Sequence, residues 1–404
     1  MKMRFPYLTK PSIKAIGILV IFSAAWMSKP AIALQLVKKP SPKKQSNQPK
    51  NIILIIGDGT GLAQWSALSA HYQYRAFAAD STHNLDIIQR DNVAVFNSFP
   101  VMGLSQTFSA NNYITDSGAG GTALSSGQKT NNYAIGVNEK GEAISSLAAI
   151  AKNQNMATGI VVTCELTHAT PAAFYAHQPK RSLMGDIAKD LYELNTIDVA
   201  IGGGYPYLKA FPFEKYNFIV PSNNEKEYPA ALNNIENGLS HGGSMQRTIL
   251  LYNQDTFPPK AHEGRAGYLE RASVAAMREL KKQPNGYFMM IEGSQVDWAC
   301  HENDSAYLMA EIIDLDNTIK AVLAEAKATG DETLIVVTAD HETGGLTLTG
   351  WDKNRGCAKL GWSTHGHTGI PVPVFAYGPG SQSFTGVYQN VDVFKKIQAL
   401  LPKK

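Results

Sequence analysis

The sequence predicts an α/β fold of three layers, in which helices cover both faces of a mostly parallel central sheet, together with a smaller inserted segment. Short apolar runs alternate along the chain with longer stretches of helical period, as expected where crossover helices follow strands. The chain also has 34 Gly among 404 residues, which fits the many tight strand-to-helix loops of such folds.

The predicted strands are continuous apolar runs. The first, NIILII, has no polar residue after its first position, as expected of a strand buried on both faces. The predicted strands are residues 51–56, 158–163, 197–201, 287–291, 333–338 and 372–377. The predicted helices are residues 143–154, 183–194, 267–282, 305–329 and 391–401. Residues 205–265, rich in Asn, Pro and aromatic residues, are expected to form an insertion of mixed structure.

The N-terminal 50 residues differ from the rest of the chain. Residues 1–33 have a basic leader, an apolar stretch and a small-x-small end at Ala33, the three parts of a secretory signal peptide. Cleavage after Ala33 would make the protein periplasmic or secreted, and the apolar stretch is too short for a stable membrane span. Residues 34–50 are expected to be a basic flexible linker, and residues 51–404 the folded domain.

The charge of the folded part argues against nucleic-acid binding. Ten Lys and Arg and no acid lie in residues 1–50, so the net charge of +3 for the whole chain leaves −7 for residues 51–404. A broad nucleic-acid-binding surface normally makes a domain basic. Three cysteines allow at most one intramolecular disulfide, so a large core must supply the stability.

Polar side chains follow several predicted strands, where open parallel sheets bind ligands. Asp58 lies in the turn GDGTG, and Asp340 and His341 follow the run at 333–338. Each has a structural alternative, because a GDG turn can serve packing alone and an Asp-His pair can cap a helix. Adjacent Asp and His can also bind one divalent metal ion.

The segment EGSQVDWACH is a stronger indication of metal binding. Asp297 and His301 are four residues apart, so on a helix they share one face and can bind one metal ion. Glu292 lies at the preceding strand end, close enough to serve a second ion. A helix N-terminus favours acids, which would explain both carboxylates but not His301. Either His365 or His367 could supply a further ligand.

This mixture of ligands predicts zinc at the His-rich positions and magnesium at a position with oxygen ligands only, and indicates no soft thiolate site. Several such cations together act most often in phosphoryl transfer. Ser117 in TDSGAGG is the candidate nucleophile, at a sharp loop into a helix predicted to begin near Thr122. An N-cap role is its alternative. No histidine adjoins Ser117, so a metal ion is expected to activate it.

In this order the motifs resemble the alkaline phosphatase family, from Asn51 to about Gly380, and imply an alkaline-phosphatase-like fold. The short bacterial type is the most similar, because His168 and Trp298 stand at two variable positions around its site. The motifs that carry the resemblance are Asp58, Thr115-Asp116-Ser117, Glu292, Asp297, His301, Thr338-Ala339-Asp340-His341 and His367-Thr368-Gly369.

The resemblance implies two Zn²⁺ ions and one Mg²⁺ ion, and a role for each matching residue. The first zinc would be bound by Asp297, His301 and His367. The second would be bound by Asp58, Asp340, His341 and the nucleophile Ser117. The magnesium would be bound by Asp58, Thr170 and Glu292. Arg181, eleven residues after Thr170, would bind two phosphate oxygens through its planar guanidinium.

The implied activity is hydrolysis of small phosphate monoesters of broad specificity, through a phosphoserine on Ser117, by a homodimer. His168 and Trp298 depart from the best-known bacterial members, which have Asp and Lys there. We therefore expect altered occupancy of the third site, by Zn²⁺ or Co²⁺, and weaker retention of phosphate.

Three alternatives stay open on the residues alone. A phosphodiesterase of the same superfamily is the nearest, although diesterases usually have Thr as nucleophile and no arginine clamp. A sulfatase would need Pro and Arg after the nucleophile, where Ser117 is followed by Gly-Ala-Gly. An exported phosphate- or metal-binding protein without turnover would leave Ser117 unexplained.

Overall fold

The computed structural model describes residues 48–79, 93–212, 217–219, 247–251, 265, 267–330, 332–352 and 357–402. These residues belong to one compact unit, Gln45–Lys404. The expected signal peptide (1–33) lies outside the described residues, as does the expected linker (34–50) except for its last three.

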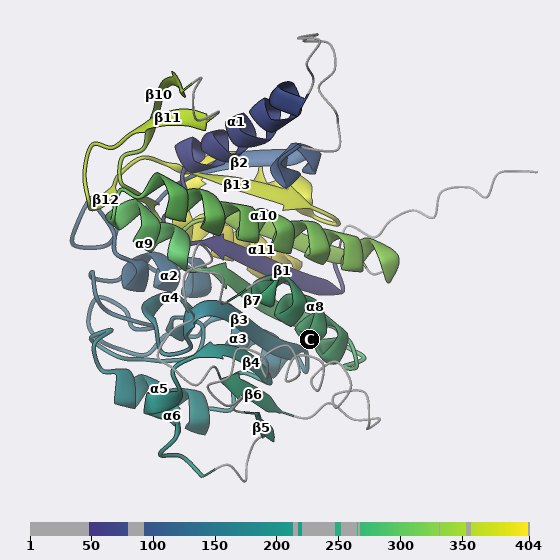
Figure 1. Ribbon diagram of the computed structural model, residues 1–404. Helices are drawn as coiled ribbons and strands as arrows, with labels where there is room; N and C mark the ends of the chain where they lie inside the picture. Colours follow the sequence, from purple (N-terminus) through teal and green to yellow (C-terminus); the bar gives the residue numbers. More distant parts are fainter. Residues whose placement is uncertain are drawn as a thin grey trace, which may run out of the picture. The chain divides into compact units, whose positions relative to one another are not determined.

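A ten-stranded sheet forms the centre of this unit (Figure 1). Among the strands that the structure describes, nine run parallel, and β13 pairs antiparallel with both of its neighbours. The mostly parallel sheet predicted from the sequence is therefore confirmed. In spatial order the strands are β14 (Gly386–Gln389), β2 (Val101–Gln106), β13 (Val372–Tyr377), β8 (Thr333–Thr338), β1 (Asn51–Gly57), β7 (Tyr287–Gly293), β3 (Ala157–Glu165), β4 (Val199–Gly203), β6 (Thr248–Leu251) and β5 (Asn217–Ile219).

Helices cover both faces of the sheet because alternate residues of its strands point to opposite sides. In β1, Ile52, Leu54 and Ile56 enter one apolar cluster, whereas Ile53 and Ile55 enter the other. The first cluster is closed by α2 (Ser117–Ser126), α3 (Leu147–Asn153), α4 (Ala169–Ala172), α5 (Met184–Glu193) and α11 (Asn390–Leu400). The second is closed by α1 (Leu62–Ala79), α8 (Tyr268–Leu280) and α10 (Ser305–Ala328). Figure 1 shows α8 and α10 in front of the sheet and α11 behind it.

Smaller elements lie around this core. The segment at 205–265, expected as an insertion, contains α6 (Tyr205–Leu208), and its strands β5 and β6 extend the central sheet at one edge rather than standing apart from it. The remaining elements are η2 (Val95–Ser98), α9 (Gln295–His301), the pair β9 (Glu342–Thr343) and β12 (His367–Thr368), the hairpin β10 (Thr347–Asp352) and β11 (Cys357–Gly361), and η5 (Ser381–Phe384).

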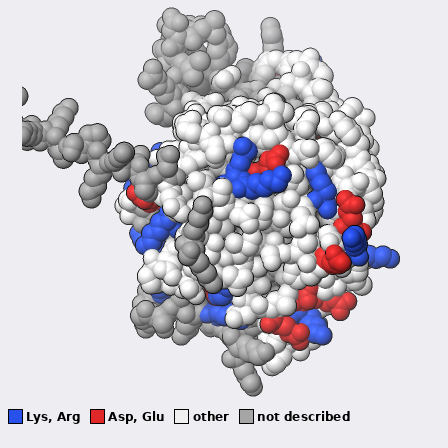
Figure 2. Space-filling view, turned by 180° about the vertical axis from the view of Figure 1, so that it is seen from behind, with Lys and Arg blue, Asp and Glu red and all other residues white. Residues whose placement is uncertain are grey.

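The surface charges are dispersed over the face seen in Figure 2. Among the coloured residues there, Lys and Arg lie close to Asp and Glu, with wide uncharged areas between them. Within the described ranges, no helix combines the length and the apolar character needed to cross a membrane. The three cysteines are free thiols.

Candidate active site

The candidate residues meet where three neighbouring parallel strands end. The order β8–β1–β7 places Asp340, Asp58 and Glu292 side by side, because each lies at or just after the carboxyl end of its strand. All three side chains are fully buried. Gly59 makes this close approach possible: its φ is +69°, and a Cβ there would lie 2.9 Å from Cα of Asp297.

The candidate nucleophile is the first residue of α2. Helix α2 begins at Ser117 rather than near Thr122, and Asp116, not Ser117, is the N-cap, accepting from the backbone N–H of Ala119 at 3.0 Å. Ser117 Oγ lies 3.2 Å from His341 Nε2. The glycines after the serine let the helix pack against the neighbouring loop, since a Cβ at Gly120 would lie 3.0 Å from the carbonyl oxygen of Asp340.

A first cluster of ligand-type side chains is formed by Asp297, His301 and His367. The two Asp297 oxygens lie 3.2 Å from His301 Nε2 and 3.6 Å from His367 Nε2, and these two nitrogens are 3.2 Å apart. Helix α9 places Asp297 and His301 on one face, whereas the β9–β12 pair carries His367 to them. The structure therefore brings together three residues that are up to 70 positions apart in the sequence.

A second cluster surrounds His341, whose Nε2 lies 3.2 Å from Ser117 Oγ. His341 Nε2 is 3.5 Å from Asp58 Oδ1 and 3.3 Å from Asp340 Oδ2. Both oxygens of Asp58 and Oδ2 of Asp340 are buried without a hydrogen bond. Buried carboxylate oxygens are normally hydrogen-bonded or bound to a cation, so these oxygens are available for a metal ion.

The three imidazoles of these clusters are oriented alike. Nδ1 of His301 donates to the carbonyl oxygen of His365, and Nδ1 of His367 donates to that of Thr115 at 2.8 Å. Nδ1 of His341 lies 3.2 Å from Thr343 Oγ1, whose own proton goes to Asp297. Each Nε2 is thereby left to point its lone pair into the site, the arrangement found in metal-binding histidines.

The electrostatics of the site also favour a cation. Burial, followed by the charges of Asp340 and Asp297, holds the pKa of Asp58 well above its ordinary range. Burial and the charge of Asp340 raise the pKa of Glu292 to about 8, and burial and the charge of Asp297 raise that of Asp340 to about 6. Buried like charges this close repel one another, and divalent cations would remove the repulsion.

A third cluster contains Glu292, Cys164 and His168. Cys164 Sγ lies 3.6 Å from Glu292 Oε2, and Thr170 lies beside the same carboxylate. The sequence indicated no soft thiolate site, although Cys164 directly follows the strand predicted at 158–163. In the structure β3 runs to Glu165, so Cys164 lies near the strand end, where candidate ligands are expected.

The candidate phosphate-binding residue, Arg181, is held by Asp116, which precedes the candidate nucleophile Ser117. It donates to Asp116 Oδ2 and to His168 Nε2, both at 3.0 Å. Burial and the nearby charge of Arg181 lower the pKa of His168 to about 3, so the imidazole is neutral and can accept this bond. The rings of Trp298 and His168 form a T-shaped pair, with centroids 6.1 Å apart.

Asp116 was part of the motif Thr115-Asp116-Ser117 in the sequence but had no role assigned, and in the structure it links α2 to Arg181. One carboxylate oxygen accepts from the backbone N–H groups of Ala119 and Tyr133, and the other accepts from Arg181. These hydrogen bonds, with the charge of Arg181, outweigh burial and lower the pKa of Asp116. An acidic residue directly before a helix-initiating serine was the available signal.

Comparison with known proteins supplies the family. The family model described as alkaline phosphatase matches residues 49–218, 252–356 and 351–402. This chain belongs to the alkaline phosphatase family. It is 30% identical to alkaline phosphatase 4 of Bacillus subtilis over 89% of this chain and 90% of that protein. It is also 27% identical to the human tissue-nonspecific isozyme over 87% of this chain and 74% of that protein.

Solved alkaline phosphatases share the fold. The enzyme of the Antarctic bacterium TAB5 is 35% identical, with a TM-score of 0.72 over 88% of this chain and 98% of that one. A cold-active enzyme of Shewanella sp. is 28% identical, with a TM-score of 0.74 over 87% of this chain and 100% of that one. A TAB5 variant with a histidine replaced by aspartate holds magnesium in its M3 site. The protein is therefore a phosphatase, and its fold is that of the alkaline phosphatases.

Substitution of Asp116 in this phosphatase tests its two contacts separately. Asp116→Asn keeps an oxygen for the N-cap but loses the charge that pairs with Arg181, so we expect kcat/KM to fall about tenfold or more with little change in stability. Asp116→Ala loses both contacts and should also lower the free energy of unfolding by about 1 kcal/mol. Steady-state kinetics and thermal unfolding measure both effects. Unchanged kcat/KM in Asp116→Asn would show that Arg181 is positioned without it.

Proposed function

We propose that the protein is an exported, metal-dependent phosphomonoesterase that hydrolyses phosphate monoesters to an alcohol and inorganic phosphate through a phosphoserine on Ser117. The observation that carries this proposal is the position of Ser117 Oγ, at a helix N-terminus and 3.2 Å from His341 Nε2. The His341 ring in turn stacks on that of His367 in the first cluster of ligand-type side chains. Alkaline phosphatase relatives along most of the chain support the same reaction.

The residues present fit metal ions at both clusters. Asp297, His301 and His367 offer one carboxylate and two imidazoles, and Asp58, Asp340 and His341 offer two carboxylates and one imidazole, which are donor sets that suit Zn²⁺. We propose a third ion, Mg²⁺, Zn²⁺ or Co²⁺, at Glu292, with Asp58 and Thr170 as further ligands. When bound, the cations would supply positive charge next to the serine hydroxyl and the phosphate oxygens.

The chain's own groups then perform a two-step displacement. Ser117 Oγ attacks phosphorus in line, and the bond from phosphorus to the ester oxygen breaks. The serine hydroxyl loses one proton and the departing alkoxide gains one, so the alcohol leaves neutral. Water next cleaves the phosphoserine from the vacated side, which releases phosphate and restores the hydroxyl. Arg181 orients two phosphate oxygens through its guanidinium, and the N-terminus of α2 favours their negative charge.

Arg181 also favours monoesters over diesters. A monoester offers this residue more unesterified oxygens than a diester does, and Asp116 holds the guanidinium in place beside Ser117. The test is release of p-nitrophenol from p-nitrophenyl phosphate and from its bis ester, before and after chelation with EDTA, with zinc and magnesium then restored. We expect activity on the monoester that disappears on chelation and returns with both metals.

Other outcomes of this test point elsewhere. Activity on the bis ester alone would place the protein among phosphodiesterases, although no observation in the structure favours that alternative. Absence of activity on either ester, with metals bound, would make a binding role the leading hypothesis. Activity that survives complete metal removal would contradict the proposed chemistry.

His168 is expected to lower the preference for magnesium at the third position. His168→Asp replaces an imidazole nitrogen by carboxylate oxygens, and Mg²⁺ prefers oxygen ligands. We expect the variant to gain activity in added magnesium, about tenfold relative to the unchanged protein under the same conditions. The magnesium bound in the aspartate variant of the TAB5 enzyme supports this expectation. Titration of activity with magnesium checks it, and identical curves for the two proteins would refute it.

The substrate range, oligomeric state and localisation of the enzyme are also proposals. We propose broad specificity for small phosphate monoesters, a homodimer, no nucleic-acid partner and no stable membrane span in the mature form. Export rests on residues 1–33, and mass spectrometry of the secreted protein would show cleavage near Ala33. Light scattering of the purified protein would give the oligomeric state.

A further inference from the structure

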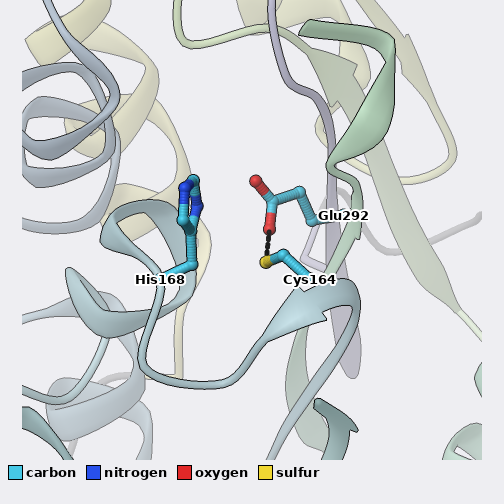
Figure 3. Close-up of side chains that lie close together, drawn as sticks. All are labelled: Cys164, His168 and Glu292. Atoms are coloured by element: carbon cyan, nitrogen blue, oxygen red, sulfur yellow. Dashed lines mark hydrogen bonds between the residues drawn. The ribbon is translucent and has the colours of Figure 1, made fainter. Parts of the chain in front are cut away.

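We propose that Cys164 and His168 bind the third metal ion directly, together with Glu292, so that this position takes Zn²⁺ or Co²⁺ through sulfur, nitrogen and oxygen. Figure 3 shows the three side chains close together at the ends of their elements. Their potential ligand atoms all lie within 4.8 Å of one another. This inference rests on the proposed function, because it concerns the same third metal position. Its test uses spectra rather than activity, so a failure of the inference can be distinguished from a failure of the proposed function.

The sheet register explains why Cys164 reaches this position. Strands β3 and β7 are parallel neighbours in which Val162 pairs with Glu292. Cys164 lies two residues beyond Val162 on the same face of β3, and both enter the same apolar cluster. The thiol is therefore held at the sheet end beside the Glu292 carboxylate, and its side chain is fully buried.

The separation of the donor atoms fits a common ion. Sγ of Cys164 lies 3.6 Å from Oε2 of Glu292. A tetrahedral zinc ion with ordinary bond lengths to sulfur and to a carboxylate oxygen separates those two atoms by about 3.5–3.7 Å. The sulfur and the oxygen could thus both bind one ion without moving apart.

Other polar atoms of these side chains lack hydrogen bonds. Oε1 of Glu292 and Nδ1 of His168 are buried without a hydrogen bond. Cys164 Sγ faces two acceptors, the carbonyl oxygen of Glu165 at 3.3 Å and Glu292 Oε2 at 3.6 Å, but one S–H can donate well to only one of them. A metal ion would use the thiolate, the imidazole and the carboxylate at once.

Binding changes the protonation of two groups. The S–H bond breaks as the metal–sulfur bond forms, and the proton passes to solvent. His168 must free a ring nitrogen for the ion and carry its proton on the other, so it stops accepting the hydrogen bond from Arg181 Nη2. This hydrogen bond is exchanged for the metal bond.

The donor set determines which ion is selected. Mg²⁺ prefers six oxygen ligands near ideal octahedral geometry, and neither a thiolate nor an imidazole suits it. Zn²⁺ and Co²⁺ bind sulfur and nitrogen well. We therefore expect Cys164→Ser to lower the preference of this position for Co²⁺ over Mg²⁺ by about tenfold or more.

Cobalt spectroscopy tests the inference on the full-length protein. The chain is freed of metals with a chelator and titrated with Co²⁺ until all positions are filled, and its near-ultraviolet absorption is recorded. We expect a sulfur-to-cobalt charge-transfer band that is lost in Cys164→Ser and kept in Cys357→Ser. The control residue, Cys357, lies in β11 outside the cluster. Competition with Mg²⁺ in the same samples gives the change in selectivity.

Two results would overturn the inference: no such band in the fully loaded native protein, or a band that persists in Cys164→Ser. X-ray absorption of the zinc-loaded native protein decides the question even where the Cys164 variant does not fold. A sulfur neighbour at about 2.3 Å from zinc supports a thiolate ligand, and nitrogen and oxygen neighbours alone exclude it. Neither measurement depends on turnover.

Discussion

Ser117→Ala is expected to abolish almost all phosphatase activity, lowering kcat by about 10⁴-fold or more, while leaving metal binding largely intact. Removal of a nucleophile from a site that acts as a unit typically costs this much. The residue is 2% exposed, so solvent has little access to the space that the hydroxyl leaves. Steady-state kinetics with p-nitrophenyl phosphate, together with metal analysis of the variant, measure both effects.

Ser126→Ala is the matched control, on the same helix. Ser126 is also buried and is the last residue of α2, at the opposite end of the helix from Ser117. Its hydroxyl donates to the carbonyl oxygen of Thr122. Its loss should lower stability slightly and leave kcat unchanged. If Ser117→Ala kept more than about a hundredth of the native kcat, Ser117 would not form the covalent intermediate.

The strands that position the site could be predicted because they are buried on both faces. All six predicted strands and all five predicted helices are present. The largest difference is in the helix predicted at 143–154, which begins only at Leu147. Strand β2 was missed because its burial alternates and its sequence, VMGLSQ, contains Gly and polar residues. Strand β14 was missed because it is short and starts with Gly. Neither carries a candidate site residue.

The site itself could be predicted only where side chains follow buried strands directly. Asp58, Glu292 and Asp340 do so, and parallel topology makes their convergence a geometric necessity. The approach of His367 depends on the short β9–β12 pairing, which has no sequence signal of its own, and the resemblance alone indicated this histidine over His365. In the structure, His365 turns its Nδ1 to the carbonyl oxygen of His301 instead.

The contacts among polar side chains could not be predicted, because they depend on distances of a few tenths of an ångström. Asp116 could have been a helix cap alone, but the fold turns its second oxygen to Arg181. Cys164 lies between Thr163 and Glu165 at the end of an apolar run, and only the β3–β7 register places it beside Glu292. Spacing along the chain carries no information on such pairings between distant segments.

Asp58→Asn is expected to have opposite effects on the metal-free and the metal-loaded protein. Asp58 is fully buried beside Asp340, Asp297 and Glu292, and burial and these charges raise its pKa. An acid whose pKa is raised by folding loses its proton first in the unfolded chain, so the stability of the metal-free protein falls as pH rises above about 4. The amide removes this penalty.

We therefore expect metal-free Asp58→Asn to unfold at a temperature higher than the native protein by about 2 °C or more at pH 8, with the difference shrinking as the pH is lowered. With zinc and magnesium added, the order should reverse, because a lost carboxylate ligand weakens metal binding and with it the stabilisation that bound metal gives. Activity should fall at least about 100-fold.

Asp198→Asn separates this effect from the general loss of a buried acid. Asp198 is also buried, but its carboxylate is satisfied by Lys152 and by the backbone N–H of Thr158. Its replacement should lower the unfolding temperature equally with and without metals. Calorimetry gives the unfolding temperature of each variant relative to the native protein, once in EDTA and once with zinc and magnesium added. If metal-free Asp58→Asn were less stable than the native protein at pH 8, repulsion among the buried carboxylates would not be what the metals relieve, and their role would be confined to catalysis.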